Sequence, residues 1–220
     1  MIAASGRRAI ELIYCANGNR RFAQIAIDAG FRYGAQLPGT IYHPIWFADQ
    51  NWKKPNRGRY MAALAQHKPN MATVLDLERP GQLDDVLAWA EEAAAFVEIV
   101  LIIPKYSGAI DVLPRVIGGK PIRLGYSVPT RYGGTDVPIW EFGGWPVHLL
   151  GGNPQNQMAL RAYLDVHSAD GNAAQRAACK WCIFWTNGRW TKHPYQGDDC
   201  IYVAFVDSCR NIAAAWEHDN

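Results

Sequence analysis

Short apolar runs, each followed directly by a polar residue or by glycine, recur along this chain and constrain its fold more than any other feature. Apolar runs of this length are typical of strands in parallel sheets, which are buried on both faces. The runs and the residues after them are 47–48 with Asp49, 72–75 with Asp76, 99–103 with Lys105 after Pro104, 122–124 with Gly125, Tyr126 and Ser127, 147–150 with Gly151 and Gly152, and 164–169 with Asp170. Since the carboxyl ends of barrel strands meet at one mouth, this pattern predicts an α/β barrel with carboxylates around one opening.

Segments with helical spacing alternate with these runs. Leu83, Val86, Leu87 and Ala90 recur at intervals of three and four residues, and Pro80 stands where a helix can begin. The expected strands are 11–16, 31–37, a short strand before Asp49, 71–76, 98–103, 122–126, 147–150 and 164–169, and the expected helices are 21–29, 57–67, 80–94, 109–116, 154–162, 171–184 and 203–216. This alternation is typical of parallel βαβ units.

The number of units favours a closed barrel. No Gly-x-Gly-x-x-Gly follows the first strand and no P-loop sequence occurs, so a Rossmann sheet explains the pattern less well. At 220 residues, without a repeat or a linker, the chain has the size of one barrel. We therefore expect an α/β fold, a single (β/α)8-type TIM barrel in a shortened or irregular form, with residues 1–220 as one domain.

Charged residues are spread through the sequence, and basic residues form two clusters. The net charge of +2 neither requires nor excludes a polyanionic partner, because local patches matter more than totals. The two basic clusters are Arg20 with Arg21, and residues 53–59, which begin with Lys53 and Lys54. They are either solvated surface charges or contacts to a phosphate backbone beside a strand-end aspartate.

The first residues and the cysteines bear on the compartment. Residues 1–11 contain Arg7 and Arg8 but no apolar core, so we expect no secretory signal. No stretch approaches the roughly 20 apolar residues that cross a bilayer. The five cysteines are an odd number scattered along the chain, which favours reduced thiols in a cytoplasmic protein.

Four acids follow strands and are candidates for chemistry: Asp49, Asp76, Glu78 and Asp170. Strand-end acids often cap the next helix or pair with arginine, and that reading stays open for each of them. Two carboxylates on opposite sides of a bond can instead divide the work of cleaving a glycosidic bond, one attacking or stabilising the anomeric carbon and the other moving protons. Asp76 and Glu78 would face the same side of an extended strand. That pair is only a weak signal for a divalent metal.

Other residues near the strand ends have two readings each. Lys105 can neutralise a phosphate or a leaving base, or it can pair with Glu78. His148 lies inside an apolar run and is expected to be a packed core histidine. Tyr126 can stack on a base or fill the core, and Trp46, Trp52, Trp140 and Trp145 flank the same loops. The strand-end glycines allow a flat ligand to approach the backbone closely.

A zinc site is a further alternative. Cys179, Cys182, His193 and Cys200 could form one, with Cys209 nearby in sequence, but the spacing after Cys179-x-x-Cys182 is irregular. No Ser-His-Asp order, nucleophile elbow or His-Glu-x-x-His occurs, so hydrolases built on those motifs lack support. We expect neither a metal nor a cofactor.

The order of the motifs resembles the tRNA-guanine transglycosylase barrel, including its phage relatives that act on DNA. The resemblance spans about residues 48–172. In that family an early strand-end aspartate acts as general base, which implies this role for Asp49 in Ala48-Asp49-Gln50. A later Asp–Glu pair recognises the base and resembles Asp76 and Glu78, and a further polar base contact falls near Lys105. The nucleophilic aspartate on a later strand would be Asp170.

Two glycine-containing turns extend the resemblance. The family's Gly-Leu-Ser-Val-Gly turn resembles residues 125–129, and its Leu-Met-Gly-Val-Gly segment resembles residues 149–154. The base site implied in this way includes Gly125, Tyr126, Ser127, Gly151, Gly152 and Asn172. Three departures stand out: Pro129 replaces a glycine that approaches the base, Lys105 replaces an amide, and the family's Cys-x-Cys-x-x-Cys zinc module is missing.

The resemblance implies an enzyme that acts on the N-glycosidic bond of a nucleobase. We expect a DNA base N-glycosylase or transglycosylase for a modified base, in the setting of phage–host conflict, with a target nucleotide swung out of the duplex. Arg20, Arg21, Lys53 and Lys54 would hold the DNA backbone. A DNA 7-deazaguanine base-exchange enzyme is the first alternative. A non-catalytic nucleic-acid-binding barrel and a hydrolase of small nucleosides are the others, and no membrane partner is expected.

Overall fold

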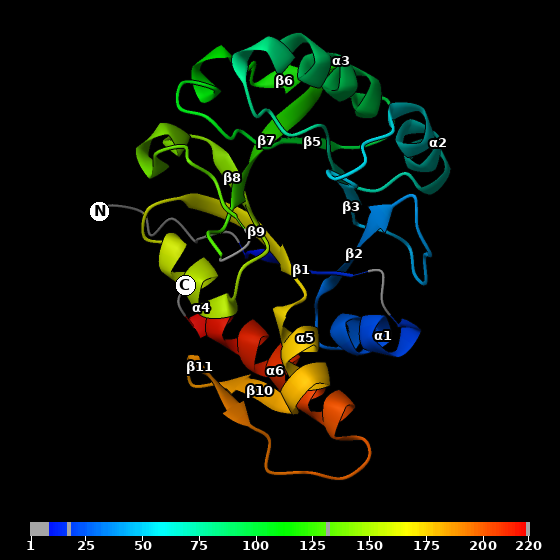
Figure 1. The fold of residues 1–220 in the computed structure, drawn as a ribbon, viewed down its shortest axis with the longest axis vertical. Helices are drawn as coiled ribbons and strands as arrows, with labels where there is room; N and C mark the ends of the chain where they lie inside the picture. Colours follow the sequence, from blue (N-terminus) through cyan, green and yellow to red (C-terminus); the bar gives the residue numbers. More distant parts are fainter. Residues whose placement is uncertain (1–8, 17–18, 131–132, 219–220) are drawn as a thin grey trace, which may run out of the picture.

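Eight parallel strands close into one barrel (Figure 1). The computed structural model describes residues 9–16, 19–130 and 133–218. In order around the barrel, the strands are β1 (Glu11–Cys15), β2 (Arg32–Leu37), β3 (Phe47–Gln50), β4 (Met71–Thr73), β5 (Ile99–Ile102), β7 (Lys120–Ser127), β8 (Pro146–Leu150) and β9 (Asp165–Gly171). The pairing of β5 with β7 and of β9 with β1 closes the ring. The prediction of a TIM-barrel-like α/β fold is confirmed.

Helices cover the outside of the barrel, and some connections lack one. The helices between consecutive barrel strands are α1 (Arg20–Asp28), α2 (Arg57–His67), α3 (Leu83–Ala94), which is preceded by the short η1 (Pro80–Gln82), and α4 (Pro154–Leu160). The helix expected at 109–116 is wrong, because only the single turn η2 (Ile110–Val112) forms before Pro114, and the short strand β6 (Val116–Ile117) follows. A proline cannot continue a helix, since it lacks the N–H and its ring clashes with the preceding turn. The long loop before β8 contains the turn η3 (Ile139–Phe142).

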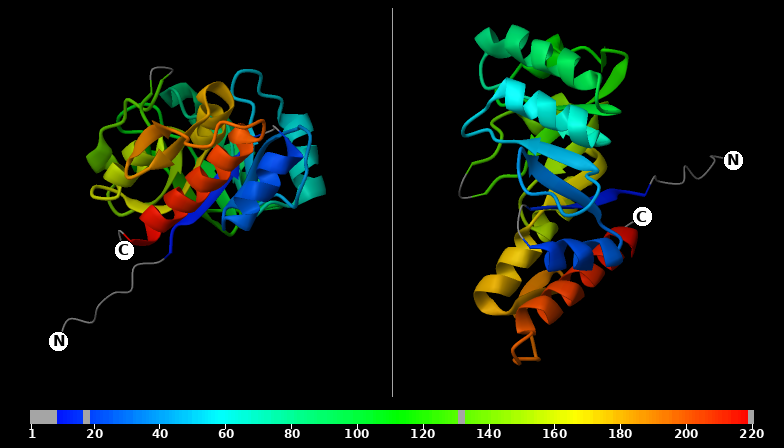
Figure 2. Two further views of the ribbon diagram at one scale, coloured as in Figure 1. Left: turned by 90° about the horizontal axis from the view of Figure 1, so that it is seen from below. Right: turned by 90° about the vertical axis from the view of Figure 1, so that its right-hand side faces the viewer.

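The segment after β9 departs most from the expectation. It forms α5 (Ala173–Trp181), the hairpin β10 (Ile183–Thr186) and β11 (Arg189–Lys192), and the long helix α6 (Cys200–His218). The helix expected at 171–184 ends early because Cys182 takes a left-handed conformation, with φ of 47°. Asn187 and Gly188 also have positive φ, as a tight two-residue hairpin turn requires. In Figures 1 and 2 the hairpin lies at one end of the long axis, beyond α5 and α6.

Helix α6 occupies the outer face of β1. The ring of Phe205 lies 5.5 Å from Tyr14 on β1 and 5.0 Å from Phe22 on α1, measured between centroids. Phe205 and Trp216 are both buried. Burying an aromatic side chain of this size is worth roughly 2–3 kcal/mol, so these contacts dock α6 onto the barrel. None of the helices in the described residues combines the length and the apolarity that a membrane crossing requires.

The barrel interior is apolar on one side and polar on the other. Ile13, Phe47, Met71 and Leu101 form an apolar cluster from strands β1, β3, β4 and β5. The facing strands β7, β8 and β9 contribute Arg123, His148 and Ser168, which are also buried. Burying polar groups costs free energy unless they are hydrogen-bonded, and these three side chains bond to one another.

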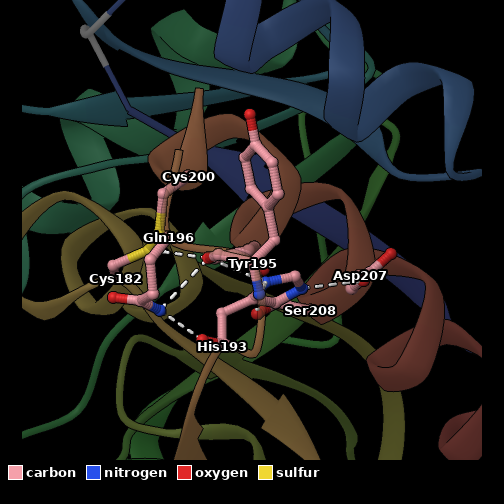
Figure 3. The surroundings of a disulfide bond; sticks show 8 residues. Cys182, His193, Tyr195, Gln196, Cys200, Asp207 and Ser208 are labelled. Atoms are coloured by element: carbon pink, nitrogen blue, oxygen red, sulfur yellow. Dashed lines mark hydrogen bonds and ion pairs between the residues drawn. A yellow bond between two sulfur atoms is a disulfide. The ribbon is translucent and has the colours of Figure 1, made fainter. Parts of the chain in front are cut away.

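A disulfide joins Cys182, next to α5, to Cys200 at the start of α6 (Figure 3). The expectation that every cysteine is reduced is therefore wrong for this pair, and Cys15, Cys179 and Cys209 are free. The hairpin is further tied to α6, since His193 Nε2 lies 3.0 Å from an oxygen of Asp207. These contacts fix the hairpin to the C-terminal helix.

Reducing this disulfide is expected to lower stability by about 3 kcal/mol, because the bridge spans 18 residues of chain and restricts the unfolded state. Urea unfolding with and without reductant measures the difference, and Cys179→Ser serves as a control that leaves it unchanged. Alkylation of the unfolded, unreduced protein should label three cysteines. Labelling of all five would contradict the pairing.

Candidate active site

The residues after the barrel strands line one cleft at the mouth of the barrel. The cleft has a volume of about 790 Å³. Its walls include Asp49 on β3, Asp76 after β4, Lys105 after β5 and Asp170 on β9. The structure thus brings together side chains that are far apart in the sequence, at the place where barrel enzymes carry their catalytic groups.

Asp49 is partly buried on the floor of this cleft. Its carboxylate accepts a hydrogen bond from the hydroxyl of Thr73, with 3.3 Å between the oxygens. Burial and, next, the nearby charges of Asp170 and Asp76 raise the pKa of Asp49 from 3.8 to about 7, although the hydrogen bonds from Thr73 and the backbone of Gln50 lower it. A group with a pKa near 7 can both accept and return a proton at neutral pH.

Asp170 is held in a fixed orientation across the cleft. One oxygen accepts a hydrogen bond from the backbone N–H of Gly151 at 3.1 Å and lies 3.3 Å from Nε2 of His148. Gly151 has a φ of 62°, which glycine adopts without strain, so the turn after β8 can aim its N–H at the carboxylate. The side chain of Asp170 is 11% exposed. These contacts leave its orientation little freedom.

A buried polar chain lies behind Asp170. Arg123 Nη1 donates to the hydroxyl of Ser168 at 2.7 Å, and that hydroxyl lies 2.7 Å from Nδ1 of His148. Since the hydroxyl of Ser168 accepts a hydrogen bond from Arg123, it can donate its own hydrogen to Nδ1 of His148, which leaves Nε2–H to point at Asp170. Burial lowers the pKa of His148, and the bond to Asp170 opposes this shift. His148 is a core histidine as expected, and it also orients a candidate catalytic carboxylate.

Lys105 joins the other polar side chains of the mouth. Its Nζ donates to Ser127 Oγ at 2.6 Å and lies 3.6 Å from a carboxylate oxygen of Asp76. Its ion pair is thus with Asp76, whereas the sequence also allowed one with Glu78. Burial raises the pKa of Asp76, and the Lys105 ammonium opposes that rise. Glu78 is exposed at the rim of the same cleft.

The predicted glycine and aromatic contacts divide into two groups. Gly151, Gly152 and Asn172 line the cleft, as the sequence predicts. Tyr126 is buried and packs edge-on against Phe142, with 5.1 Å between ring centroids, so the structure does not bring it into the cleft. On the same strand, Ser127 points into the cleft because alternate side chains of a strand face opposite sides.

Gly125 is explained by packing rather than by a ligand. A Cβ at this position would stand 2.7 Å from the side chain of Ile103 and 2.8 Å from that of Leu150. Gly152 is constrained in the same way, since a Cβ there would stand 2.5 Å from Val128. Both distances are shorter than real Cβ contacts allow, so these positions have no room for a side chain.

The predicted backbone-binding cations lie in loops and helix starts above the barrel strands. Arg20 begins α1, and Lys53 and Lys54 follow β3; all three are exposed. Arg21 is already engaged, because it pairs with Asp199 at 3.2 Å and its guanidinium stacks on the ring of Tyr202 at 3.6 Å. Arg21 therefore attaches α1 to α6 although it is exposed, and Arg20, Lys53 and Lys54 are the other three predicted cations at the surface.

Several cleft residues were not identified from the sequence. Cys15 ends β1 beside Asp49 and Asp170, and burial raises the pKa of its thiol well above the usual value. Asp136 and Arg176 also line the cleft. Cys15 could have been predicted from the sequence as a cleft residue, because it stands at the end of the first strand and such positions meet at the mouth of a barrel. Arg176 lies in the first turn of the helix after Asp170, and that position faces the mouth of a barrel.

Metal binding has little basis in this arrangement. Two members of the proposed zinc set, Cys182 and Cys200, are joined to each other as a disulfide. Within the described part of the chain, no group of three or more His, Cys, Asp or Glu side chains is placed to hold a metal ion.

Comparison with known sequences identifies the family but not the activity. Residues 26–217 match a family of unknown function (DUF6610). The chain belongs to this family. No curated protein matches the sequence. The family match includes β3 with Asp49 and β9 with Asp170. The likeness to the tRNA-guanine transglycosylase barrel remains a prediction.

Asp49→Asn is expected to stabilise the protein at pH 8. In the unfolded chain this carboxyl ionises near its usual 3.8, but in the folded protein it ionises at about 7, so stability falls as the pH rises from about 4 to about 7 and stays lowered above that range. The free energy of unfolding should rise by on the order of 2–4 kcal/mol at pH 8 and by much less at pH 4.5.

Urea denaturation at the two pH values measures this difference. The exposed substitution Asp111→Asn is the matched control, for which no comparable change between the two pH values is expected. An Asp49→Asn protein whose gain is the same at both pH values would contradict a raised pKa for Asp49.

Proposed function

We propose that the protein cleaves the N-glycosidic bond of a modified nucleobase in DNA. The observation that carries the proposal is the placement of Asp49 and Asp170 in one cleft, with Asp170 close enough to raise the pKa of Asp49. Two carboxylates in different environments suit this reaction, because one can act on the sugar carbon while the other carries protons.

The proposed roles follow from the contacts of each aspartate. Asp170, oriented by Gly151 and His148, attacks C1′ of the target nucleotide or stabilises its developing positive charge. The bond from C1′ to the base nitrogen breaks, and its electron pair leaves with the base. Asp49 then takes a proton from water as that water attacks C1′ and releases Asp170, and it passes this proton to the departing base. The products are a free base and an abasic site.

Recognition of the base is assigned to the polar side chains on the far side of the cleft. Lys105 offers a donor, and Asp76 and Glu78 offer acceptors at the same mouth. Trp52, which is 60% exposed and lines the cleft, replaces Tyr126 as the proposed stacking partner. Arg20, Lys53 and Lys54 are the proposed contacts to the DNA backbone. Swinging a nucleotide out of a duplex into this cleft costs a few kcal/mol.

Excision is favoured over exchange within this proposal. Pro129 and Lys105 replace residues that, by the resemblance, would grip a free deazaguanine. The DNA 7-deazaguanine base-exchange reaction is the alternative outcome at the same site, with the incoming base in place of water. A modified base in DNA suits phage–host conflict in the cytoplasm, and we place the activity there.

Release of a base from DNA tests the proposal. Duplex DNA with and without 7-deazaguanine derivatives is incubated with the protein, and mass spectrometry detects free base, while a labelled free base reports exchange. Asp170→Asn and Asp49→Asn should each lower the rate about a hundredfold or more. Asp111→Asn is the control and should keep the rate.

Three outcomes would count against the proposal. Neither release nor exchange from any DNA would remove the enzymatic function, and tight DNA binding that survives both substitutions would then favour a non-catalytic barrel. Cleavage of free nucleosides without salt-dependent DNA binding would favour a small-molecule hydrolase. Full activity in both variants would remove the roles of the two aspartates.

A further inference from the structure

A second groove opens beside the active-site cleft. It has a volume of about 270 Å³ and lies between α5 and the β10–β11 hairpin. Thr130, Gly152 and Arg176 line both hollows, so the groove and the cleft are direct neighbours. Figure 1 shows α5 leading from the barrel strands toward the hairpin. A ligand longer than one nucleotide can extend from the cleft in this direction.

Most of the groove is formed by a segment of the chain in which every charged side chain is basic. Residues 171–197 contain no Asp or Glu, although the whole sequence has 20. The same residues contain four exposed cations, which are Arg176, Lys180, Arg189 and Lys192. Arg176 and Lys180 line the groove itself. A local excess of positive charge beside a cleft is the electrostatic requirement for a phosphate backbone.

Two tryptophans supply flat surfaces in the same groove. Trp181, at the end of α5, and Trp190, on β11, line it. Trp181 is 62% exposed, and the Nζ of Lys180 lies 5.4 Å from the centre of its ring. A large aromatic side chain exposed next to cations is typical of sites where unpaired bases stack.

The groove is supported from behind, so it does not need to form on binding. Trp185 N–H donates to Ser208 Oγ at 3.0 Å, and Asn211 Nδ2 donates to Trp185 O at 2.8 Å, which joins β10 to α6. The Cys182–Cys200 disulfide ties the end of α5 to the same helix. A preformed groove avoids the entropic cost of ordering on binding.

We propose that this groove binds the nucleotides next to the target nucleotide, as a single strand with one base stacked on Trp181. This proposal rests on the function proposed for the cleft, and it narrows the expected DNA substrate of that cleft. Arg176 and Lys180 contact the phosphates that follow the reacting nucleotide. Stacking requires a base without a partner, so the substrate is single-stranded DNA, or a duplex that is open on this side of the target.

Binding to short DNA tests this inference separately from catalysis. The protein carries Asp170→Asn so that it cannot turn over, and a fluorescent 12-nucleotide single strand is titrated by anisotropy at several salt concentrations. Trp181→Ala and Lys180→Glu should each weaken binding about tenfold. Lys180→Glu should also reduce the dependence of affinity on salt.

The chain offers matched controls for both substitutions. Lys68→Glu makes the same charge change at the C-terminal end of another helix, α2, and Trp140→Ala removes another exposed tryptophan, on η3. Both control variants should bind within twofold of the parent. Thermal melting of all four variants verifies that they are folded, as expected for side chains at the surface.

Each result distinguishes this inference from the function proposed for the cleft. If the parent binds the single strand and the groove variants bind equally well, the groove inference is overturned and base release remains to be judged by its own assay. Failure of the parent to bind the single strand, or equal Trp181-dependent binding to a fully paired duplex, also overturns it. Weakened binding in the groove variants, with no base released by the wild-type protein, supports the groove and removes the glycosylase function.

Discussion

The pairing of β9 with β1 is the constraint on which the site depends. Its register sets Asp170 opposite Ile13, and the chain from β1 through β2 to β3 then sets Asp49 opposite Gln36. Residues more than a hundred positions apart therefore face one cleft. A slip of one residue in either register would turn an aspartate to the outer face of the barrel, because alternate side chains of a strand point to opposite sides. The site therefore forms only when the barrel closes in this register. The apolar cluster inside the barrel stabilises the closed barrel and, with it, the site.

The polar part of the barrel interior adds a second requirement. Arg123, Ser168 and His148 are buried, and their mutual hydrogen bonds end at Asp170. Removing any one of them leaves a buried polar group without its partner, which typically costs 1–3 kcal/mol. The two aspartates are held differently: burial disfavours the charge of Asp49, whereas one oxygen of Asp170 accepts a hydrogen bond from Gly151 and lies beside Nε2 of His148. Asp49 therefore lowers the stability of the fold progressively as the pH rises from about 4 to about 7.

Sequence patterns predicted the barrel strands and most helices because those depend on local apolar periodicity. The same reasoning brought Asp49, Asp76, Lys105 and Asp170 to one mouth, since the ends of parallel strands converge. It did not separate the two faces of β7, so Tyr126 was expected in the cleft although it packs outward on Phe142. The hairpin was missed despite Asn187-Gly188, a strong turn signal, because the helix expected at 171–184 included the first two residues of β10. The polar chain behind Asp170 joins three strands and has no local signature.

The central claim is that Asp49 and Asp170 share one cavity and influence each other. Carboxyl carbon NMR of aspartate-labelled protein, titrated from pH 4 to pH 9, measures this directly, with Asp49 assigned by substitution. The account predicts a pKa of about 7 for Asp49 in the wild-type protein and a lower pKa in an Asp170→Asn variant, because a nearby negative charge has been removed. A pKa near 4 in the wild-type protein, or one that Asp170→Asn leaves unchanged, would contradict it.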